Sequence, residues 1–143
     1  MSIRTIVVGV DGSEGSDRAV AWAAGLASQV GARVVAVHTF EPLAHLTDGP
    51  VDFARIEAEV RETLDHEWVA PLVSARVEYE ALVRHGVPAE VLVDTAEQTD
   101  ADLLVIGARG LGTLAGLALG STSTKVVHVS DRPVVVVPPA RRT

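Results

Sequence analysis

The sequence contains no cysteine among its 143 residues. This absence excludes a disulfide framework, a thiolate metal site and a cysteine nucleophile. A chain without disulfides is compatible with a reducing compartment, and we expect a cytoplasmic protein. Residues 1–10 lead directly into an apolar segment, without the separate basic, apolar and cleavage regions of a signal peptide, so we expect no export.

Two further absences limit the partners that we expect. No apolar stretch approaches the ~20 residues that a membrane-spanning helix needs, so we expect no membrane insertion. The formal net charge is −7, and the basic residues are scattered apart from Arg141 and Arg142. Such a chain offers no basic face that could follow a phosphate backbone, which argues against nucleic acid as a partner. A small phosphorylated ligand is still compatible with this charge, because it needs only a few local donors.

Short apolar runs alternate with helical patterns along the whole sequence. The length predicts a single domain, residues 1–143, that can bury about 68% of its unfolded surface. Apolar, β-branched runs predict strands at residues 5–10, 33–38, 103–106 and 134–137, and alternation of apolar and polar residues predicts a further strand at residues 76–84, the third in chain order. Four helices are predicted between them, starting at Ser13 or Ser16, near Val51, at Val87 and at Ser121. We expect Trp22 and Trp68 to anchor their helices in the core.

This alternation predicts an α/β fold, a doubly wound five-stranded parallel sheet with helices on both faces and right-handed crossovers. We expect the strand order 3-2-1-4-5. In that order the chain reverses direction between strands one and four, where ligands bind beyond the carboxyl ends of the strands. Asp11 follows the first strand and Gly107 ends the fourth. Two segments far apart in the sequence are therefore predicted to meet at one crevice.

Residues 102–125, DLLVIGARGLGTLAGLALGSTSTK, join a predicted strand to a predicted helix through a glycine-rich loop. Gly107, Gly110 and Gly120, followed by Ser121, have the spacing G-x2-G-x9-G-[ST]. Glycine lets the backbone approach a ligand closely, and the first N–H groups of a helix lack partners and carry positive partial charge. The segment therefore predicts an anion site. The alternative is a flexible connection without a ligand.

The glycine spacing resembles the nucleotide-binding motif of the universal stress protein family. Residues 6–13 (IVVGVDGS), His38 in VVAVHTF and residues 134–138 (VVVVP) are also similar to that family, so the resemblance spans essentially the whole chain. It implies a Rossmann-like fold of the adenine nucleotide alpha hydrolase-like type. It also implies a protein that binds ATP, or another adenine nucleotide, as a nucleotide-dependent stress-response or signalling module.

The resemblance implies contacts to the nucleoside. Gly9 and Val10 would line the base pocket, and the backbone of Thr39 would contact adenine. The Asp11 carboxylate would accept hydrogen bonds from the ribose hydroxyls or the adenine edge. Capping of the first helix is the alternative role for Asp11, and the two roles can coexist.

The resemblance also implies contacts to the phosphates. Gly107 and Gly110 would admit the ribose and phosphates, and Arg109 would add a charge-assisted contact unless it is simply solvated. Backbone N–H and hydroxyl donors would come from the start of the last helix, at Gly120, Ser121, Thr122 and Ser123. Mg²⁺ or Mn²⁺ would be carried mainly by the phosphates, without a metal site in the protein.

Other nucleotide and catalytic motifs fit less well. Residues 110–115 (GLGTLA) match the looser dinucleotide pattern G-x-G-x-x-[GA], but Asp131 precedes the next strand instead of ending it, where the ribose-binding acid belongs. No Walker A motif, zinc-type histidine spacing or G-x-S-x-G elbow occurs. We assign no catalytic residue and expect nucleotide binding, with weak ATP hydrolysis or a nucleotide-independent dimeric adapter as alternatives.

The last predicted strand, Val134 to Val137, is short and apolar and would lie at an edge of the sheet. The family resemblance implies a homodimer through this segment. The alternative is an edge covered by the terminal residues 139–143.

Overall fold

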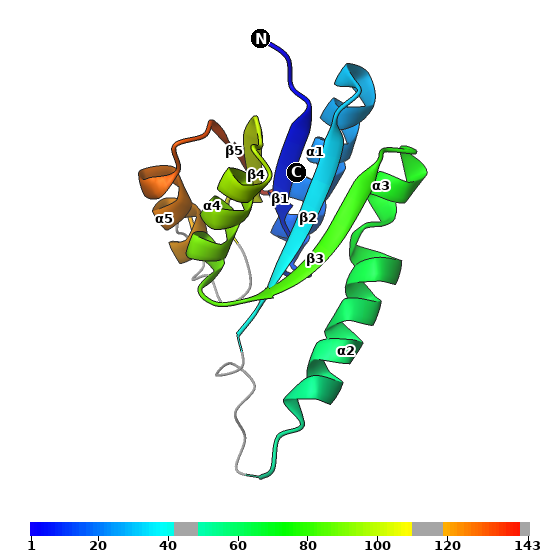
Figure 1. Ribbon diagram of the computed structural model, residues 1–143, viewed down its shortest axis with the longest axis vertical. Coiled ribbons are helices and arrows are strands. Elements are labelled where there is room, and N and C mark those ends of the chain that lie inside the picture. The colour runs from blue at the N-terminus through cyan, green and yellow to red at the C-terminus, as the bar shows by residue number, and fades with distance from the viewer. Residues whose placement is uncertain (42–48, 110–118, 141–143) are drawn as a thin grey trace.

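The computed structural model describes residues 1–41, 49–109 and 119–140. Five parallel strands form one sheet in the order β3-β2-β1-β4-β5 (Figure 1). The strands are β1 (Thr5–Gly9), β2 (Arg33–Phe40), β3 (Tyr79–His85), β4 (Leu103–Gly107) and β5 (Val134–Val137). The predicted fold class and strand order are confirmed.

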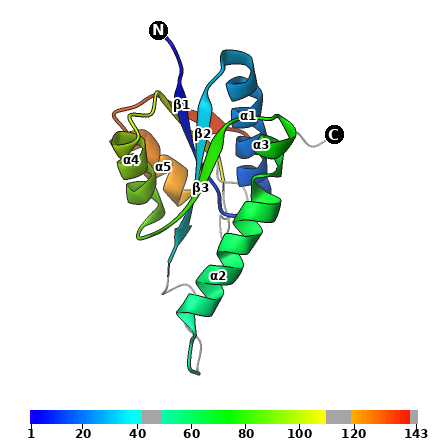
Figure 2. The same cartoon turned by 45° about the vertical axis from the view of Figure 1, so that its right-hand side comes forward.

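Helices cover both faces of the sheet. They are α1 (Glu14–Val30), α2 (Phe53–Thr63), the π-helix η2 (Leu64–Trp68), α3 (Ala70–Ser74), α4 (Pro88–Gln98) and α5 (Ser121–Val129). Figures 1 and 2 show α4 and α5 together on one face and α1 with α3 on the other. Helix α2 lies beside β3 and continues past the carboxyl ends of the strands. In the described ranges, no helix has both the length and the apolar character that crossing a bilayer requires.

The core consists of two apolar layers, one on each face of the sheet. Ile6 and Val8 of β1 pack on the α1 side, and Val7 packs on the α4 and α5 side; all three are fully buried. The neighbouring strands β2 and β4 alternate in the same way. Burial on both faces is the reason that the central strands are continuously apolar instead of alternating with polar residues.

Helix α1 packs on the sheet through small residues. Ser13 is its N-cap, the earlier of the two predicted starts, and Gly31 ends it in the left-handed conformation with φ 75°. The buried stripe of α1 is mostly alanine, at positions 19, 23, 24 and 27. Trp22 lies off this stripe and is 41% exposed, so the expectation that Trp22 anchors the core is wrong.

The second predicted helix and the third predicted strand differ in extent from the expectation. The pattern from residue 51 to 68 divides into α2 and the π-helix η2, and the half-buried Trp68 ends η2. Strand β3 begins at Tyr79 instead of Arg76, because Arg76 has a left-handed backbone (φ 55°) that interrupts an extended chain. Strand β2 continues to Phe40, two residues beyond its predicted end.

Asp102, directly before β4, links this strand to the start of β1 by hydrogen bonds. Its Oδ2 accepts hydrogen bonds from the backbone N–H groups of Arg4, at 2.8 Å, and Thr5, at 3.1 Å. These two bonds, the Arg4 bond first, hold the pKa of the Asp102 carboxyl below its usual value. The charged form therefore stabilises the fold above the unfolded-state pKa, and that contribution is lost as the pH falls through the folded-state pKa.

We expect Asp102→Asn, which keeps an acceptor oxygen but not the charge, to be less stable than the unmodified protein at pH 7. The difference should begin to shrink below about pH 4, where the carboxyl of the unfolded chain protonates, and should disappear as the folded protein also protonates at lower pH. Urea unfolding across this pH range measures it. We expect a modest loss of stability, because Asp102 is exposed. A difference in stability that does not depend on pH would show that the carboxylate charge contributes nothing.

Candidate functional site

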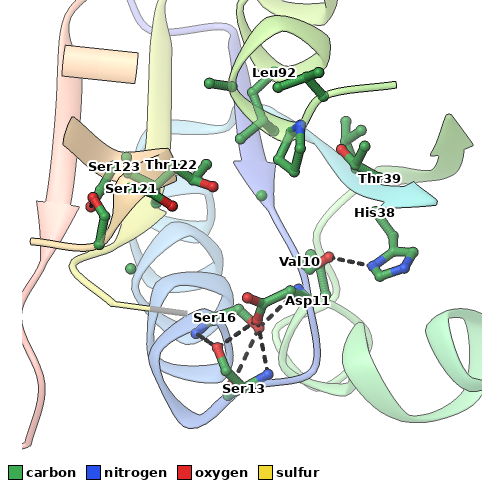
Figure 3. Close-up of a pocket in the computed structure, with 18 of the residues that line it drawn as sticks. Val10, Asp11, Ser13, Ser16, His38, Thr39, Leu92, Ser121, Thr122 and Ser123 are labelled. Carbon is green, nitrogen blue, oxygen red and sulfur yellow. Dashed lines mark hydrogen bonds between the residues drawn. The ribbon is translucent and has the colours of Figure 1, made fainter. Parts of the chain in front are cut away.

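A cavity of about 710 Å³ opens at the carboxyl ends of β1, β2 and β4 (Figure 3). This volume lies within the ~300–1,000 Å³ typical of small-molecule sites. The strand order reverses between β1 and β4, so the segments that follow these two strands diverge to opposite faces and leave a crevice. The first turns of α1, α4 and α5 and the side chains of Val60 and Trp68 form the remaining walls. The cavity lies where the topology predicted a ligand crevice.

The structure brings the sequence-predicted residues together at this cavity. Ten of the eleven candidates line it: Gly9, Val10, Asp11, Thr39, Gly107, Arg109, Gly120, Ser121, Thr122 and Ser123. The eleventh, Gly110, lies outside the described residues, as do residues 111–118 of the glycine-rich segment and the dinucleotide-like pattern within it. Their assignment as ligand contacts stays a prediction.

Asp11 is part of the turn that starts α1. Its Oδ1 accepts hydrogen bonds from the Ser13 backbone N–H, at 2.9 Å, and from the Ser13 hydroxyl (Figure 3). Ser13 Oγ in turn accepts from the Ser16 N–H at 3.1 Å, and the Asp11 N–H donates to Ser16 Oγ at 3.2 Å. Ser13, and not Asp11, is therefore the N-cap of α1, and Asp11 stabilises the turn that precedes the helix. The same bonds fix the Asp11 carboxylate at the cavity wall, so both roles are geometrically compatible.

The N-terminus of α5 presents fewer donors than the sequence predicted. The Gly120 N–H donates to the Ala108 carbonyl at 2.7 Å, and the buried Ser123 hydroxyl donates to the same oxygen at 2.8 Å. These two donors already form hydrogen bonds within the protein and are therefore not available to a ligand. The first bond from within α5 is Thr124 N–H to Gly120 O, so the N–H groups of residues 121–123 have no intrahelical partner. The donors at this positive helix end are therefore the Ser123 N–H together with Ser121 and Thr122, which each carry an N–H and a hydroxyl.

The requirement for glycine at position 107 has a cause that sequence reasoning missed. A Cβ at Gly107 would lie 2.6 Å from the carbonyl oxygen of Gly15, and a Cβ at Gly15 would lie 2.2 Å from the carbonyl oxygen of Arg109. The first turn of α1 and the end of β4 therefore pack backbone against backbone. Close packing, and not only access for a ligand, explains Gly107. Gly15 was overlooked because a glycine early in a helix shows no pattern of its own.

The floor of the cavity is apolar. A Cβ at Gly9 would lie 3.1 Å from the Leu92 side chain of α4, so the glycine lets α4 pack against the end of β1. Val37, Ala89 and Ile106 complete this floor. The α4 residues were missed at the sequence level because their helical spacing indicated only core packing.

His38 and Trp68 close the cavity on the side of α1. His38 Nδ1 lies 2.7 Å from the Val10 carbonyl oxygen, and it is the donor because a carbonyl only accepts (Figure 3). The imidazole ring packs on the Trp68 indole with 5.1 Å between ring centroids. His38 therefore packs on Trp68 at the cavity wall. The sequence did not indicate that Trp68 borders the cavity.

The charges around the cavity are unevenly distributed. Near the start of α1, burial raises the pKa of Asp17, and the carboxylates of Asp11 and Glu14 raise it further. The lining includes the cationic side chains of Arg109 and, on α5, Lys125. An elongated ligand with one anionic end would therefore be favoured with that end toward α5.

Comparison with known proteins identifies relatives along the whole domain. The model of the universal stress protein family matches residues 2–138. A universal stress protein from Thermus aquaticus is 34% identical over 134 residues, which cover 94% of this chain and 98% of that protein. One from Mycolicibacterium smegmatis is 33% identical over 92% of this chain but only 47% of its own length, so the chain spans about half of that relative.

Solved structures share the fold. A universal stress protein in complex with cAMP is 33% identical, with a TM-score of 0.70 over 96% of this chain and 98% of that chain. The Archaeoglobus fulgidus universal stress protein in complex with dAMP is 26% identical, with a TM-score of 0.72 over 96% and 99%. UspA from Lactobacillus plantarum, at 21% identity and a TM-score of 0.75 over 96% and 99%, is similar in fold.

Proposed function

Because the chain belongs to the universal stress protein family, we propose that it binds an adenine nucleotide, preferentially ATP, in the cavity between β1 and β4. The bound nucleotide serves as the input of a stress-response or signalling module. One observation carries the proposal: residues from separate segments of the chain line a single cavity with an apolar floor and a helix N-terminus at its wall. An apolar base and an anionic phosphate need this combination.

The proposed pose follows the chemistry of the cavity. The base lies on the floor around Gly9 and Leu92, near the backbone of Thr39. The ribose hydroxyls donate to the Asp11 carboxylate, which Ser13 already holds in place. The phosphates extend to the first turn of α5, where backbone N–H groups and the dipole favour negative charge.

Two relatives support an adenine nucleotide as the ligand, since one was solved with cAMP and the other with dAMP. The preference for ATP is the finer part of the proposal. It rests on the intact glycine spacing, which ends at Gly120 and Ser121, and on the cationic side chains of Arg109 and Lys125 in the cavity lining. A longer phosphate chain can contact more of these groups than a monophosphate can.

Mg²⁺ or Mn²⁺ would reach the site with the nucleotide. Across residues 1–41, 49–109 and 119–140, no three His, Asp or Glu side chains are grouped so that they could hold a metal ion. Mg²⁺ commonly keeps several waters and binds through substrate phosphates, so a cavity without a metal cluster fits an ion carried by ATP. The chain's own part is to bind and orient the nucleotide.

The test is to identify what the purified protein carries and what stabilises it. We expect denaturation to release an adenine nucleotide that mass spectrometry identifies. ATP at about 100 times its Kd should stabilise the fold by about 2.7 kcal/mol, which raises Tm by roughly 5–10 °C, whereas GTP should have little effect. If no nucleotide is released and none shifts Tm, the adapter is the better assignment. Conversion of ATP to ADP at a useful rate would indicate the hydrolase.

We also propose a homodimer through β5. This strand lies at the end of the sheet and pairs with β4 on one side, while Val134, Val135 and Val136 are only partly buried. An apolar edge strand can pair with the same strand of a second copy. Light scattering after size-exclusion chromatography should give twice the 15.0 kDa chain mass.

Val136→Lys should shift this dimer toward monomer, because it places two like charges at the paired edges. The matched control is Val73→Lys on α3, at a valine that is 56% exposed and belongs to the helix before β3, the strand at the edge of the sheet opposite β5. It should leave the mass unchanged. A monomeric unmodified protein, or a Val136→Lys variant that stays dimeric, would contradict an interface at β5.

A further inference from the structure

Lys125 is the only lysine in the sequence, and it lines the cavity from the second turn of α5. Its Nζ lies 3.4 Å from Oε1 of Glu90, which belongs to the first turn of α4. The pair joins two helices whose N-terminal turns both form the cavity wall. The Glu90 side chain itself is not part of the lining.

The position of Lys125 on α5 directs it toward the phosphate end of the cavity. Ser121 precedes it by four residues and Thr122 by three, so all three side chains share one helix face. Figure 3 shows Ser121 and Thr122 on the first turn of α5, across the cavity from Thr39. Side chains on an α-helix lean toward its N-terminus. The Lys125 side chain therefore leans toward the turn whose N–H groups have no partner within α5.

The contact between Lys125 and Glu90 is weak enough to be exchanged. The side chains are 48% and 61% exposed, so water and salt screen their attraction. A phosphate at the start of α5 carries more charge than a carboxylate and is also stabilised by the helix end. A ligand in the cavity meets Lys125 and not Glu90, so the ammonium can move from the carboxylate to the phosphate without a change in the backbone.

We propose that Lys125 is a phosphate-binding residue of this cavity, which Glu90 holds in the free protein and releases to a polyphosphorylated ligand. The inference rests on the proposed function, since it concerns the same cavity. It adds a residue outside the glycine motif and a rule of selection: affinity rises with the charge of the phosphate chain. Arg109 and the α5 N-terminus bind a single phosphate, and Lys125 raises the affinity for ligands with additional phosphate charge.

Titration calorimetry of Lys125→Gln with adenosine, AMP and ATP tests this rule. We expect the affinity for ATP to fall about tenfold, the loss for AMP to be smaller and the affinity for adenosine to stay unchanged. Lys125→Arg should restore most of the ATP affinity. Glu90→Gln should raise it about twofold to threefold, because the competing carboxylate is gone. Arg55→Gln, which removes a more exposed cation on α2 outside the cavity, is the control and should change nothing.

The single lysine permits a second measurement on the unmodified protein. Acetylation followed by mass spectrometry can label only Lys125 and the N-terminal amine. ATP should slow the labelling of Lys125 several-fold and leave that of the N-terminus unchanged, which serves as an internal control.

The outcomes distinguish a failure of the Lys125 inference from a failure of the proposed function. If the unmodified protein binds ATP but Lys125→Gln binds it equally well, the inference is wrong and the proposed function stands. The inference is also wrong if all three ligands lose affinity equally, since that pattern reports a general distortion of the cavity. If the unmodified protein binds none of them, the proposed function fails and this inference fails with it.

Discussion

Replacing Gly120 by valine is expected to lower the affinity for ATP at least about a hundredfold while the protein still folds. Gly120 lines the cavity directly before the N–H groups of Ser121 and Thr122, and a branched side chain there would keep the phosphates away from them. Each charge-assisted hydrogen bond that is lost costs about 1.5–3 kcal/mol, so two of them account for this loss. Calorimetric titration with ATP measures it.

The fold should tolerate this change because the Gly120 backbone is extended, with φ −77° and ψ 173°, a conformation that valine also adopts. Its N–H bond to the Ala108 carbonyl does not depend on the side chain. We expect a stability loss of about 1 kcal/mol from the poorer N-cap. Gly25→Val is the matched control, since nothing lies within 4 Å of a Cβ there. A folded Gly120→Val protein with unchanged ATP affinity would contradict the phosphate site.

Replacing Gly107 by alanine is expected to cost about 2–4 kcal/mol of stability. The new Cβ would lie 2.6 Å from the carbonyl oxygen of Gly15 and 2.7 Å from its carbon, and ordinary contact begins at 3.4 Å. Both neighbours are backbone atoms, so no side chain can rotate away and α1 must move from β4. A protein of this size should lose roughly 5–15 °C in Tm. Urea and thermal unfolding measure the loss.

Gly15→Ala tests the same contact from its other side, because its Cβ would lie 2.2 Å from the Arg109 carbonyl oxygen. The double variant should lose less than the sum of the single losses, since one separation of α1 from β4 relieves both clashes. Gly25→Ala, on the exposed side of α1, should be neutral or stabilising by about 0.5–1 kcal/mol. Wild-type stability in both Gly107→Ala and Gly15→Ala would contradict the described packing.

The fold and the place of the cavity could be predicted because both follow from chain order. Five buried strands alternating with helices leave few arrangements, and the reversal between β1 and β4 is a property of the topology. Residues at or just beyond the carboxyl ends of the strands, such as Asp11 after β1 and Thr39 near the end of β2, therefore come together without knowledge of any side-chain contact. The glycine spacing predicted that the start of α5 would also line the cavity.

The missed features depend on contacts between elements, which spacing along one element does not reveal. Leu92 has the helical period of a core residue, and only the close approach of α4 to Gly9 places it in the cavity floor. Gly15 matters because of β4, a neighbour more than 90 residues away along the chain. Trp22 was misjudged for a related reason: the alanine stripe of α1 forms the contact with the sheet, and a tryptophan beside that stripe stays exposed.

The most direct test of the account is a crystal structure of the protein grown with ATP and Mg²⁺. We predict adenine on the floor formed by Gly9 and Leu92, the ribose at Asp11, and phosphates at the N–H groups of Ser121 and Thr122 with the Lys125 ammonium turned from Glu90 toward them. ATP bound elsewhere, or a crevice between β1 and β4 that stays without nucleotide at saturating ATP, would contradict it.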